Sequence, residues 1–230
     1  MNLKETAARA ALRYVRDGMT LGLGTGSTAG YAVIGIGELV RQGYHLQAVA
    51  TSEATAAQAR ALDIPLLEID EAAHVDLDID GVDEIDPQFN AIKGGGGALF
   101  REKVIAGMAA EVIWIMDDSK PVRQLGAFPL AVEIVPYGSV QLLAKMKSLG
   151  WQPELRMRNG ERFVTDSGNL IADLHLGRGF PVAETAGQLD AMTGVLEHGL
   201  FPGICRRIIV GTPEGARIIE NPSCNADEPA

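Results

Sequence analysis

The first half of the chain alternates short apolar segments with helical patterns, and this alternation most constrains the fold. Apolar periodicity predicts helices over residues 4–15, 28–42, 53–62 and 98–111, and strands over 20–23, 46–50, 65–69 and 75–79. Residues 112–116, VIWIM, are apolar without interruption, which is typical of a strand buried on both faces. The pattern predicts an α/β fold, a Rossmann-like open, mostly parallel sheet with helices on both faces.

The pattern changes after residue 128 and predicts a second, smaller α+β domain. Expected there are strands at 130–135, 154–158, 163–165 and 170–174, helices at 139–149 and 182–192, and a hairpin turn at 166–169. An apolar strand at 207–210 is expected to rejoin the first sheet. We therefore expect a Rossmann-like catalytic domain, residues 1–127 plus 201–230, and an α+β domain, residues 128–200. The last ten residues, NPSCNADEPA, are expected to be frayed.

Composition excludes several classes of protein. The net charge of −10 argues against a broad nucleic-acid-binding or anionic-membrane surface, and no apolar run is long enough to cross a bilayer. The N-terminal residues predict an amphipathic helix and not a signal peptide. Cys205 and Cys224 form no C-x-x-C pair, which suits the reducing cytoplasm. The four histidines lack metal-ligand spacing, so we expect no metal site.

The segment from Asp80 to Lys103 carries the densest chemistry of the chain. Acids follow the expected strand at 75–79, Lys93 precedes four consecutive glycines, and Glu102 comes early in the next helix. Glycines cost backbone entropy and are worth having where the backbone turns sharply or lies against a ligand. A strand end, a glycine loop and a helix N-terminus together favour an anion such as phosphate.

These residue types suit proton transfer on a small phosphorylated molecule. A carboxylate such as Glu102 can remove a proton beside a carbonyl, while Lys93 or backbone N–H groups hold the developing oxyanion. Asp80 and Asp83 can hold sugar hydroxyls or act as acid and base, but aspartates also commonly form turns. A solvated acidic loop followed by a flexible linker explains poorly a glycine run between a strand and an apolar helix.

A second glycine-rich loop, GLGTGST at residues 22–28, follows the first expected strand. It departs from G-x-G-x-x-G because Ser27 replaces the third glycine, and it lacks the Walker Gly-Lys-Ser/Thr sequence. Thr25, Ser27 and Thr28 could bind a phosphate together with the amide of Gly26. The alternative is a helix N-cap, which needs only one such hydroxyl.

Several motifs together resemble type A ribose-5-phosphate isomerases. They are DGVDE, IKGGGGAL and REK in the segment from Asp80, the GLGTGSTA loop, the Thr51-Ser52-Glu53 and Asp118-Ser119-Lys120 sequences, and the segments 128–133 and 199–201. The resemblance extends over almost the whole chain, from about residue 4 to about residue 219. Val82 and Gly97 depart mildly from it, at positions where alanine is usual or common.

This resemblance implies an aldose–ketose isomerase of carbohydrate metabolism, in the non-oxidative pentose phosphate pathway, that interconverts D-ribose 5-phosphate and D-ribulose 5-phosphate through a cis-enediolate. It implies Glu102, Asp80 and Lys93 as catalytic residues, with Asp80 helping to open the sugar ring and Asp83 holding hydroxyls. It further implies a set of substrate-binding residues: Thr25, Gly26, Ser27, Thr28, Asp80, Gly81, Asp83, Lys93, Gly94, Gly95, Gly96 and Lys120. Lys4 is a candidate supporting charge for the phosphate.

The resemblance also implies no cofactor, a sugar-phosphate substrate, no nucleic-acid or membrane partner, and a cytoplasmic homo-oligomer, a homodimer or a tetramer. Two rivals use a related α/β architecture. A non-catalytic sugar-phosphate-binding effector domain has no need of Glu102, and no DNA-binding segment is recognised beside the domain. A coenzyme A transferase-like enzyme would use its carboxylate as a nucleophile.

Overall fold

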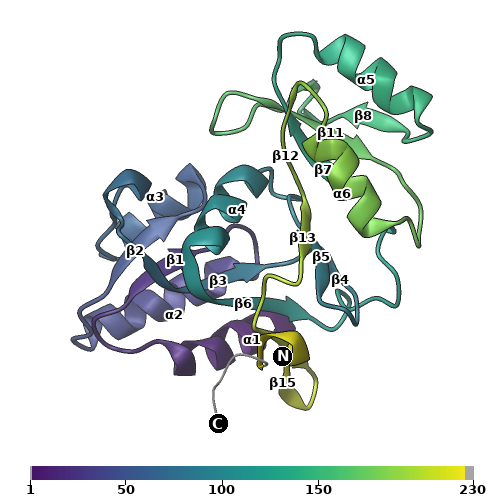
Figure 1. Cartoon of the computed structure of the whole chain (residues 1–230). Coiled ribbons are helices and arrows are strands. Elements are labelled where there is room, and N and C mark those ends of the chain that lie inside the picture. The colour runs from purple at the N-terminus through teal and green to yellow at the C-terminus, as the bar shows by residue number, and fades with distance from the viewer. Residues whose placement is uncertain (1, 226–230) are drawn as a thin grey trace. The chain divides into compact units, whose positions relative to one another are not determined.

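The computed structural model describes residues 2–225 of the chain. These residues form two compact units (Figure 1). The first unit comprises Met1–Val82, Arg101–Lys120 and Gly203–Ala230, and the second comprises Asp83–Phe100 and Pro121–Pro202. The domain bounds expected from the sequence, 1–127 with 201–230 and 128–200, stay a prediction. The compact units differ from them, because residues 83–100 cluster with the second unit.

The first unit is built on a six-stranded sheet in the order β15-β14-β6-β3-β1-β2. The strands are β1 (Thr20–Leu23), β2 (Gln47–Ala50), β3 (Val75–Gly81), β6 (Ala109–Asp117), β14 (Arg207–Thr212) and β15 (Gly215–Glu220). Neighbouring strands pair in parallel except β15, which is antiparallel to β14. The open, mostly parallel sheet of an α/β fold is therefore confirmed, and β14 rejoins it as expected.

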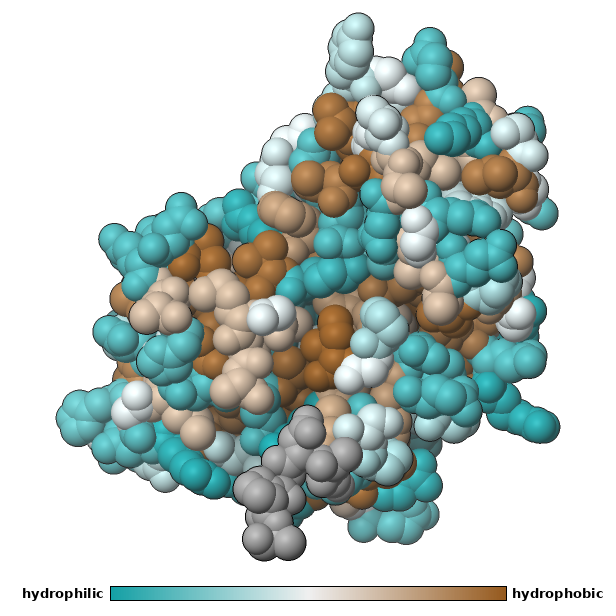
Figure 2. Space-filling view, in the orientation of Figure 1, coloured by the Kyte–Doolittle hydropathy of each residue, from teal (hydrophilic) through white to brown (hydrophobic). Residues whose placement is uncertain are grey.

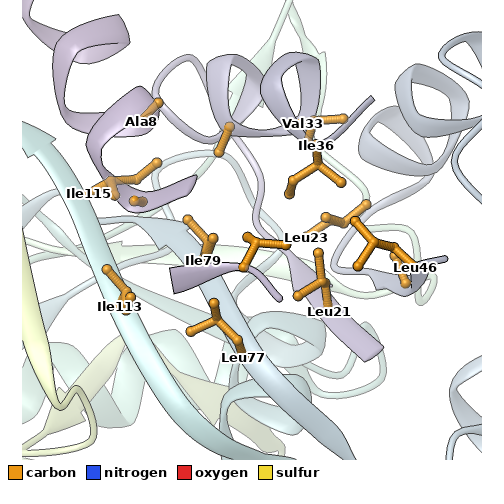
Figure 3. Close-up of a cluster of buried hydrophobic side chains, with 14 of the residues drawn as sticks. Ala8, Leu21, Leu23, Val33, Ile36, Leu46, Leu77, Ile79, Ile113 and Ile115 are labelled. Carbon is orange, nitrogen blue, oxygen red and sulfur yellow. The ribbon is translucent and has the colours of Figure 1, made fainter. Parts of the chain in front are cut away.

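Helices cover this sheet because each presents an apolar stripe to it. They are α1 (Leu3–Ala11), α2 (Ala29–Arg41), α3 (Glu53–Ala61) and α4 (Leu99–Met108). In Figure 3, Leu21, Leu77 and Ile113 rise from the strands toward the helices that carry Ala8 and Ile36. Side chains alternate along a strand, so the even-numbered residues of β3 face the opposite side of the sheet, where α4 packs.

The second unit contains a four-stranded antiparallel sheet in the order β12-β7-β11-β8. Its strands are β7 (Leu130–Ile134), β8 (Pro153–Leu155), β11 (Leu170–Leu174) and β12 (Val195–His198), with helices α5 (Ser139–Ser148) and α6 (Val182–Asp190). A smaller sheet in the order β13-β5-β4 joins β4 (Glu84–Ile85), β5 (Asn90–Ile92) and β13 (Leu200–Pro202). A further hairpin pairs β9 (Met157–Arg158) with β10 (Glu161–Arg162).

Besides the strand expected at 163–165, where only a single bridge joins Val164 to Leu170, three expectations about elements need correction. Residues 65–69 form no strand; a single bridge links Ala48 to Leu66, and the chain then turns into a 3₁₀ helix, Ile69–Glu71. The helix after the glycines ends at Met108, and β6 begins at once with Ala109.

The third correction concerns the C-terminal segment, which we expected to be frayed from residue 221. Asn221 is buried, its side-chain amide donates to the carbonyl of Cys205 at 2.9 Å, and its N–H donates to the carbonyl of Arg206. A 3₁₀ turn, Pro222–Asn225, follows. Residues 226–230 lie outside the described part of the chain.

The surface mixes polar and apolar side chains. On the face drawn in Figure 2, hydrophilic residues interrupt the hydrophobic ones. The large apolar side chains that are most exposed belong to the second unit, namely Tyr137, Val140, Met157 and Val164. Within the described residues, no helix has the length and apolar character needed to span a membrane.

Candidate active site

Two buried aspartates on β3 explain two of the glycines in the first loop. Gly22 of β1 pairs with Asp78 of β3, and a Cβ atom on Gly22 would lie 2.5 Å from the Asp78 carboxylate. A Cβ on Gly24 would lie 2.0 Å from Oδ1 of Asp80 and 2.5 Å from its Cα atom. Both aspartates are fully buried. Gly22 and Gly24 therefore leave room for the acids of the neighbouring strand.

The backbone after Gly24 is tied directly to Asp80. The N–H group of Thr25 donates to Oδ1 of Asp80 at 3.0 Å, and the same oxygen accepts from the N–H of Gly81. The carboxylate thus fixes the start of the first loop against the carboxyl end of β3. This edge is where open parallel sheets bind their ligands.

Thr25 does not present its hydroxyl as a simple phosphate ligand. Its Oγ1 lies 2.6 Å from Oγ1 of Thr51, 2.8 Å from Oγ of Ser52 and 3.2 Å from Oγ1 of Thr55. Oγ1 of Thr55 in turn donates to the carbonyl of Gly24 at 3.0 Å. This hydroxyl cluster joins the loop after β1 to the loop after β2, so the Thr25 side chain holds the two loops together.

Ser27 and Thr28 occupy the start of α2. Thr28 is the N-cap residue and makes no side-chain capping hydrogen bond, so the simple capping explanation does not account for it. Gly26 and Ser27 are exposed, and Lys4 donates from Nζ to Oγ of Ser27 at 2.9 Å. An open groove of about 600 Å³ lies beside this contact, lined by Asn2, Lys4, Ser27, Gly30, Tyr31, Ile34 and Gln58.

Lys120 lies in the turn after β6, in the same unit. Burial tends to raise the pKa of the Asp117 carboxyl, but hydrogen bonds from Ser119 outweigh it and the pKa is lowered, with the positive charges of Lys120 and Lys4 adding to the effect. Asp117 therefore feels two lysines that come from distant parts of the sequence. Cationic charge gathers at this edge of the sheet.

Glu102 is buried on the sheet-facing side of α4. One turn later on the same face, Ile105 packs over Gly22, 2.7 Å from where a Cβ atom would stand. Because β6 begins directly after α4, the helix runs antiparallel to the strands and its first turn lies toward their carboxyl ends. The three residues from Glu102 to Ile105 rise about 4.5 Å along the helix, of the same order as the two-residue step of about 6.6 Å from Asp78 to Asp80. Glu102 and Asp80 thus share one buried edge of the first unit.

In the second unit, Asp83 is bonded to the glycine loop. Oδ2 of Asp83 accepts from the N–H of Gly95 at 2.8 Å, and the N–H of Asp83 donates to the carbonyl of Ile92. Lys93 is 2 % exposed, and its ammonium group lies 5.5 Å from the centre of the Phe201 ring. Its backbone pairs with Gly199, where a Cβ atom would clash with the Lys93 carbonyl.

Positive φ angles at two positions give the glycine run its shape. Gly94 has φ of 103° and Gly97 has φ of 85°, values that side-chain-bearing residues rarely adopt. The N–H of Gly97 donates to the carbonyl of Gly94 at 3.0 Å, which closes the turn. A Cβ on Gly97 would lie 2.4 Å from the Phe163 ring. Gly94 and Gly97 are therefore required by backbone geometry and close packing.

In the first unit the structure brings Thr25, Asp80 and Gly81 together, and the direction of α4 puts Glu102 toward the same carboxyl ends of the strands. The hydroxyls of Ser27 and Thr28 lie at the start of α2, near Lys4. In the second unit it brings Asp83 together with Gly94 and Gly95. Sequence reasoning did not assign roles to Thr51, Ser52, Thr55 or Asp78, although the Thr51-Ser52-Glu53 sequence had marked the loop after β2.

One group of side chains in the second unit has the make-up of a metal site: Asp190, Glu197 and His198. Nε2 of His198 lies 3.1 Å from Oδ1 of Asp190, and Nδ1 accepts from the N–H of Leu200 at 3.2 Å. With Nδ1 accepting, Nε2 carries the proton toward Asp190. Both ring nitrogens therefore serve the fold around β12.

A mostly parallel sheet with acids, hydroxyls and lysines at its carboxyl edge defines an α/β enzyme for a small anionic substrate. Residues 47–215 match the family described as ribose 5-phosphate isomerase A (phosphoriboisomerase A). The chain is 51% identical over 221 residues to ribose-5-phosphate isomerase A of Streptococcus suis, covering 96% of this chain and 99% of the relative. The chain belongs to the ribose 5-phosphate isomerase A family and is an isomerase.

Solved structures agree with this assignment. The fold is similar to ribose 5-phosphate isomerase A from Methanocaldococcus jannaschii, with a TM-score of 0.90 and 32% identity over 95% of this chain and 98% of that one. It is also similar to a D-ribose-5-phosphate isomerase in complex with phospho-erythronic acid, with a TM-score of 0.92 and 35% identity, covering 96% of this chain and 100% of that one.

Proposed function

We propose that this chain interconverts D-ribose 5-phosphate and D-ribulose 5-phosphate by proton transfer through a cis-enediolate. Family membership supports the reaction. The structural observation that carries the mechanism is the pair of buried acids, Asp80 and Glu102, at one edge of the first unit. A buried carboxylate is a strong base toward a carbon acid, because little water competes for its lone pairs.

In the proposed mechanism Asp80 assists opening of the furanose ring. Glu102 then removes the proton from C2 of the open-chain aldose, and negative charge moves to the carbonyl oxygen on C1. Lys93 and N–H groups of residues 94–96 stabilise that charge. Glu102 returns the proton to C1, and the proton of the C2 hydroxyl passes to the oxygen on C1, so that C1 becomes a CH2OH group and C2 the ketone carbonyl. Atoms balance without any external oxidant or reductant.

We assign the substrate phosphate to the start of α2. The supporting observations are the exposed Ser27, the N-cap position of Thr28 and the cation of Lys4 within hydrogen-bonding distance of Ser27. A helix N-terminus offers free amides and a favourable dipole to such an anion. Lys120 is the second supporting charge, and the backbone of Gly26 completes the loop.

Sugar hydroxyls are assigned to Asp83 and to the backbone at Gly81, with Thr25 keeping the loop in place. The similar isomerase that holds phospho-erythronic acid supports a phosphorylated open-chain ligand, since that compound is a four-carbon acid with a phosphate at its end. Its planar carboxylate has the two-oxygen arrangement of an enediolate.

The experiment is incubation of the purified chain with ribose 5-phosphate alone, followed by a ketopentose assay. An isomerase forms ketopentose until a fixed ratio of the two sugars is reached, from either direction. A binding-only effector domain gives no product, and a coenzyme A transferase needs a thioester and an acid. The absence of ketopentose would overturn the proposed function.

We further propose a homo-oligomer, either a dimer or a tetramer, which light scattering on the purified chain tests directly. The cytoplasmic location stays a prediction that rests on the scarcity of cysteine. Cys205 is buried and Cys224 is partly buried, and both are free thiols in this structure.

A further inference from the structure

Arg156 reaches the glycine loop from a distant part of the second unit. It directly follows β8, and its Nη1 donates to the carbonyl of Gly94 at 2.7 Å and to the carbonyl of Gly95 at 3.2 Å. Two successive carbonyl groups of the loop therefore accept from one guanidinium group. The proposed reaction assigns no role to Arg156.

Asp173 on β11 holds the guanidinium group in place. Nε of Arg156 donates to Oδ2 of Asp173 at 2.9 Å, and Nη2 donates to the other carboxylate oxygen, so the pair is bidentate. The side chains are only 14% and 19% exposed, and the N–H of Arg156 donates to the carbonyl of Ile171 on the same strand. The sheet thus presents a fixed cation to the loop.

One peptide group of the loop is held at both ends. The carbonyl of Gly94 accepts from Arg156, while the N–H of Gly95, in the same peptide plane, donates to Asp83 at 2.8 Å. In a trans peptide the C=O and N–H groups point in opposite directions, so these two bonds fix the orientation of the plane. The peptide plane between Gly95 and Gly96 is oriented in the same way. Its carbonyl, on Gly95, accepts from Arg156, so the N–H of Gly96 points away from Arg156.

We propose that Arg156, anchored by Asp173, is a positioning residue for the isomerase reaction. It orients the 94–95 and 95–96 peptide groups, so that Asp83 is held for the sugar hydroxyls and the N–H of Gly96 is presented to the oxyanion. Arg156 touches no reacting atom and acts through the loop. The inference rests on the proposed function and adds a residue to its machinery.

The test compares Arg156→Gln and Arg156→Lys with the matched control Arg158→Gln. Arg158 also lies over the Phe163 ring, with its guanidinium 4.3 Å from the ring centre, but it is exposed. Misplacing a catalytic group by about 1 Å costs roughly a hundredfold in rate. We expect kcat of Arg156→Gln to fall by about that factor and KM to rise by a smaller factor, because the Asp83 contact to the sugar is disturbed while the phosphate contacts are elsewhere. Arg156→Lys keeps one donor and should lose less.

Chemical rescue separates positioning from general support of the fold. In Arg156→Ala, millimolar guanidinium ion should restore part of kcat, whereas methylammonium should restore less because it cannot bind Asp173 and both carbonyls together. Asp173→Asn, which keeps the side-chain volume but loses the charge, should lower kcat in the same direction as Arg156→Gln. Thermal unfolding of each variant shows whether it is folded at the assay temperature.

The outcomes are distinguishable from failure of the proposed function. If the wild-type chain forms no ketopentose, the function itself is wrong. If wild type and Arg158→Gln are active and folded Arg156→Gln matches them, only the positioning role is wrong. If Arg156→Gln does not fold, Asp173→Asn with wild-type kcat, or Arg156→Ala without rescue by guanidinium, overturns the inference.

Discussion

At the scale of single residues, the proposed chemistry depends on Glu102. The change Glu102→Gln keeps the size of the side chain but removes its ability to accept a proton from carbon. General-base catalysis contributes about two to four orders of magnitude, so kcat should fall by at least a hundredfold while binding of ribose 5-phosphate persists. Ketopentose assays measure kcat, and calorimetric titration measures binding.

The control is Glu38→Gln, which changes an exposed carboxylate paired with Arg9 and should keep full activity. Turnover of Glu102→Gln near the wild-type value would remove Glu102 from the mechanism.

Gly24 is the other residue with a sharp consequence. In Gly24→Ala the new methyl group would overlap Asp80, including its backbone, and overpacking of this kind costs about 1–3 kcal/mol. We expect a lower melting temperature and a large loss of kcat, because Asp80 must move. The matched change is Gly107→Ala in α4, where a Cβ atom meets nothing within 4 Å and helix propensity favours alanine by about 1 kcal/mol. If Gly24→Ala were as stable and active as Gly107→Ala, this result would contradict the close packing of Asp80 against Gly24 of the neighbouring loop.

At the scale of elements, the start of α2 should carry the substrate phosphate. The double change Ser27→Ala with Thr28→Ala removes two hydroxyls, and neither caps the helix, so α2 should remain folded. Hydrogen bonds to a charged group are worth about 1.5–3 kcal/mol each, which predicts at least a tenfold rise in KM for ribose 5-phosphate. Unphosphorylated ribose is the internal control and should be affected far less. Equal effects on both sugars would make the loop structural, and phosphate found at residues 94–97 in a co-crystal would reverse the orientation of the substrate.

At the scale of the whole molecule, a carboxylate-driven proton transfer needs no Lewis acid. We therefore expect full activity after exhaustive dialysis against a chelator. The group Asp190, Glu197 and His198 is the strongest metal-ligand set that we find among residues 2–225, and its histidine nitrogens are already bonded within the fold. Loss of activity that one divalent ion restores would point to a metal-assisted hydride shift. In that case Asp190→Asn would show whether this group is involved.

The sequence by itself determined the α/β architecture, the glycine segment with its acids, and the family. These features depend on the periodicity of apolar residues and on residue types that are close together in the sequence. Both can be related to helices, strands and turns through local backbone preferences. The prediction of a strand at 65–69 was wrong, because a short apolar run is also compatible with a single bridge followed by a turn.

Only the tertiary structure decided what several of those residues contact. Gly22 and Gly24 looked like part of a phosphate loop, yet they make room for Asp78 and Asp80 on the neighbouring strand. The Thr25 hydroxyl is bonded to the loop after β2, and Arg156 reaches the glycine run from far along the chain. Such contacts depend on strand order and side-chain packing. These bring together residues that are far apart in the sequence, so the sequence spacing does not predict the contacts.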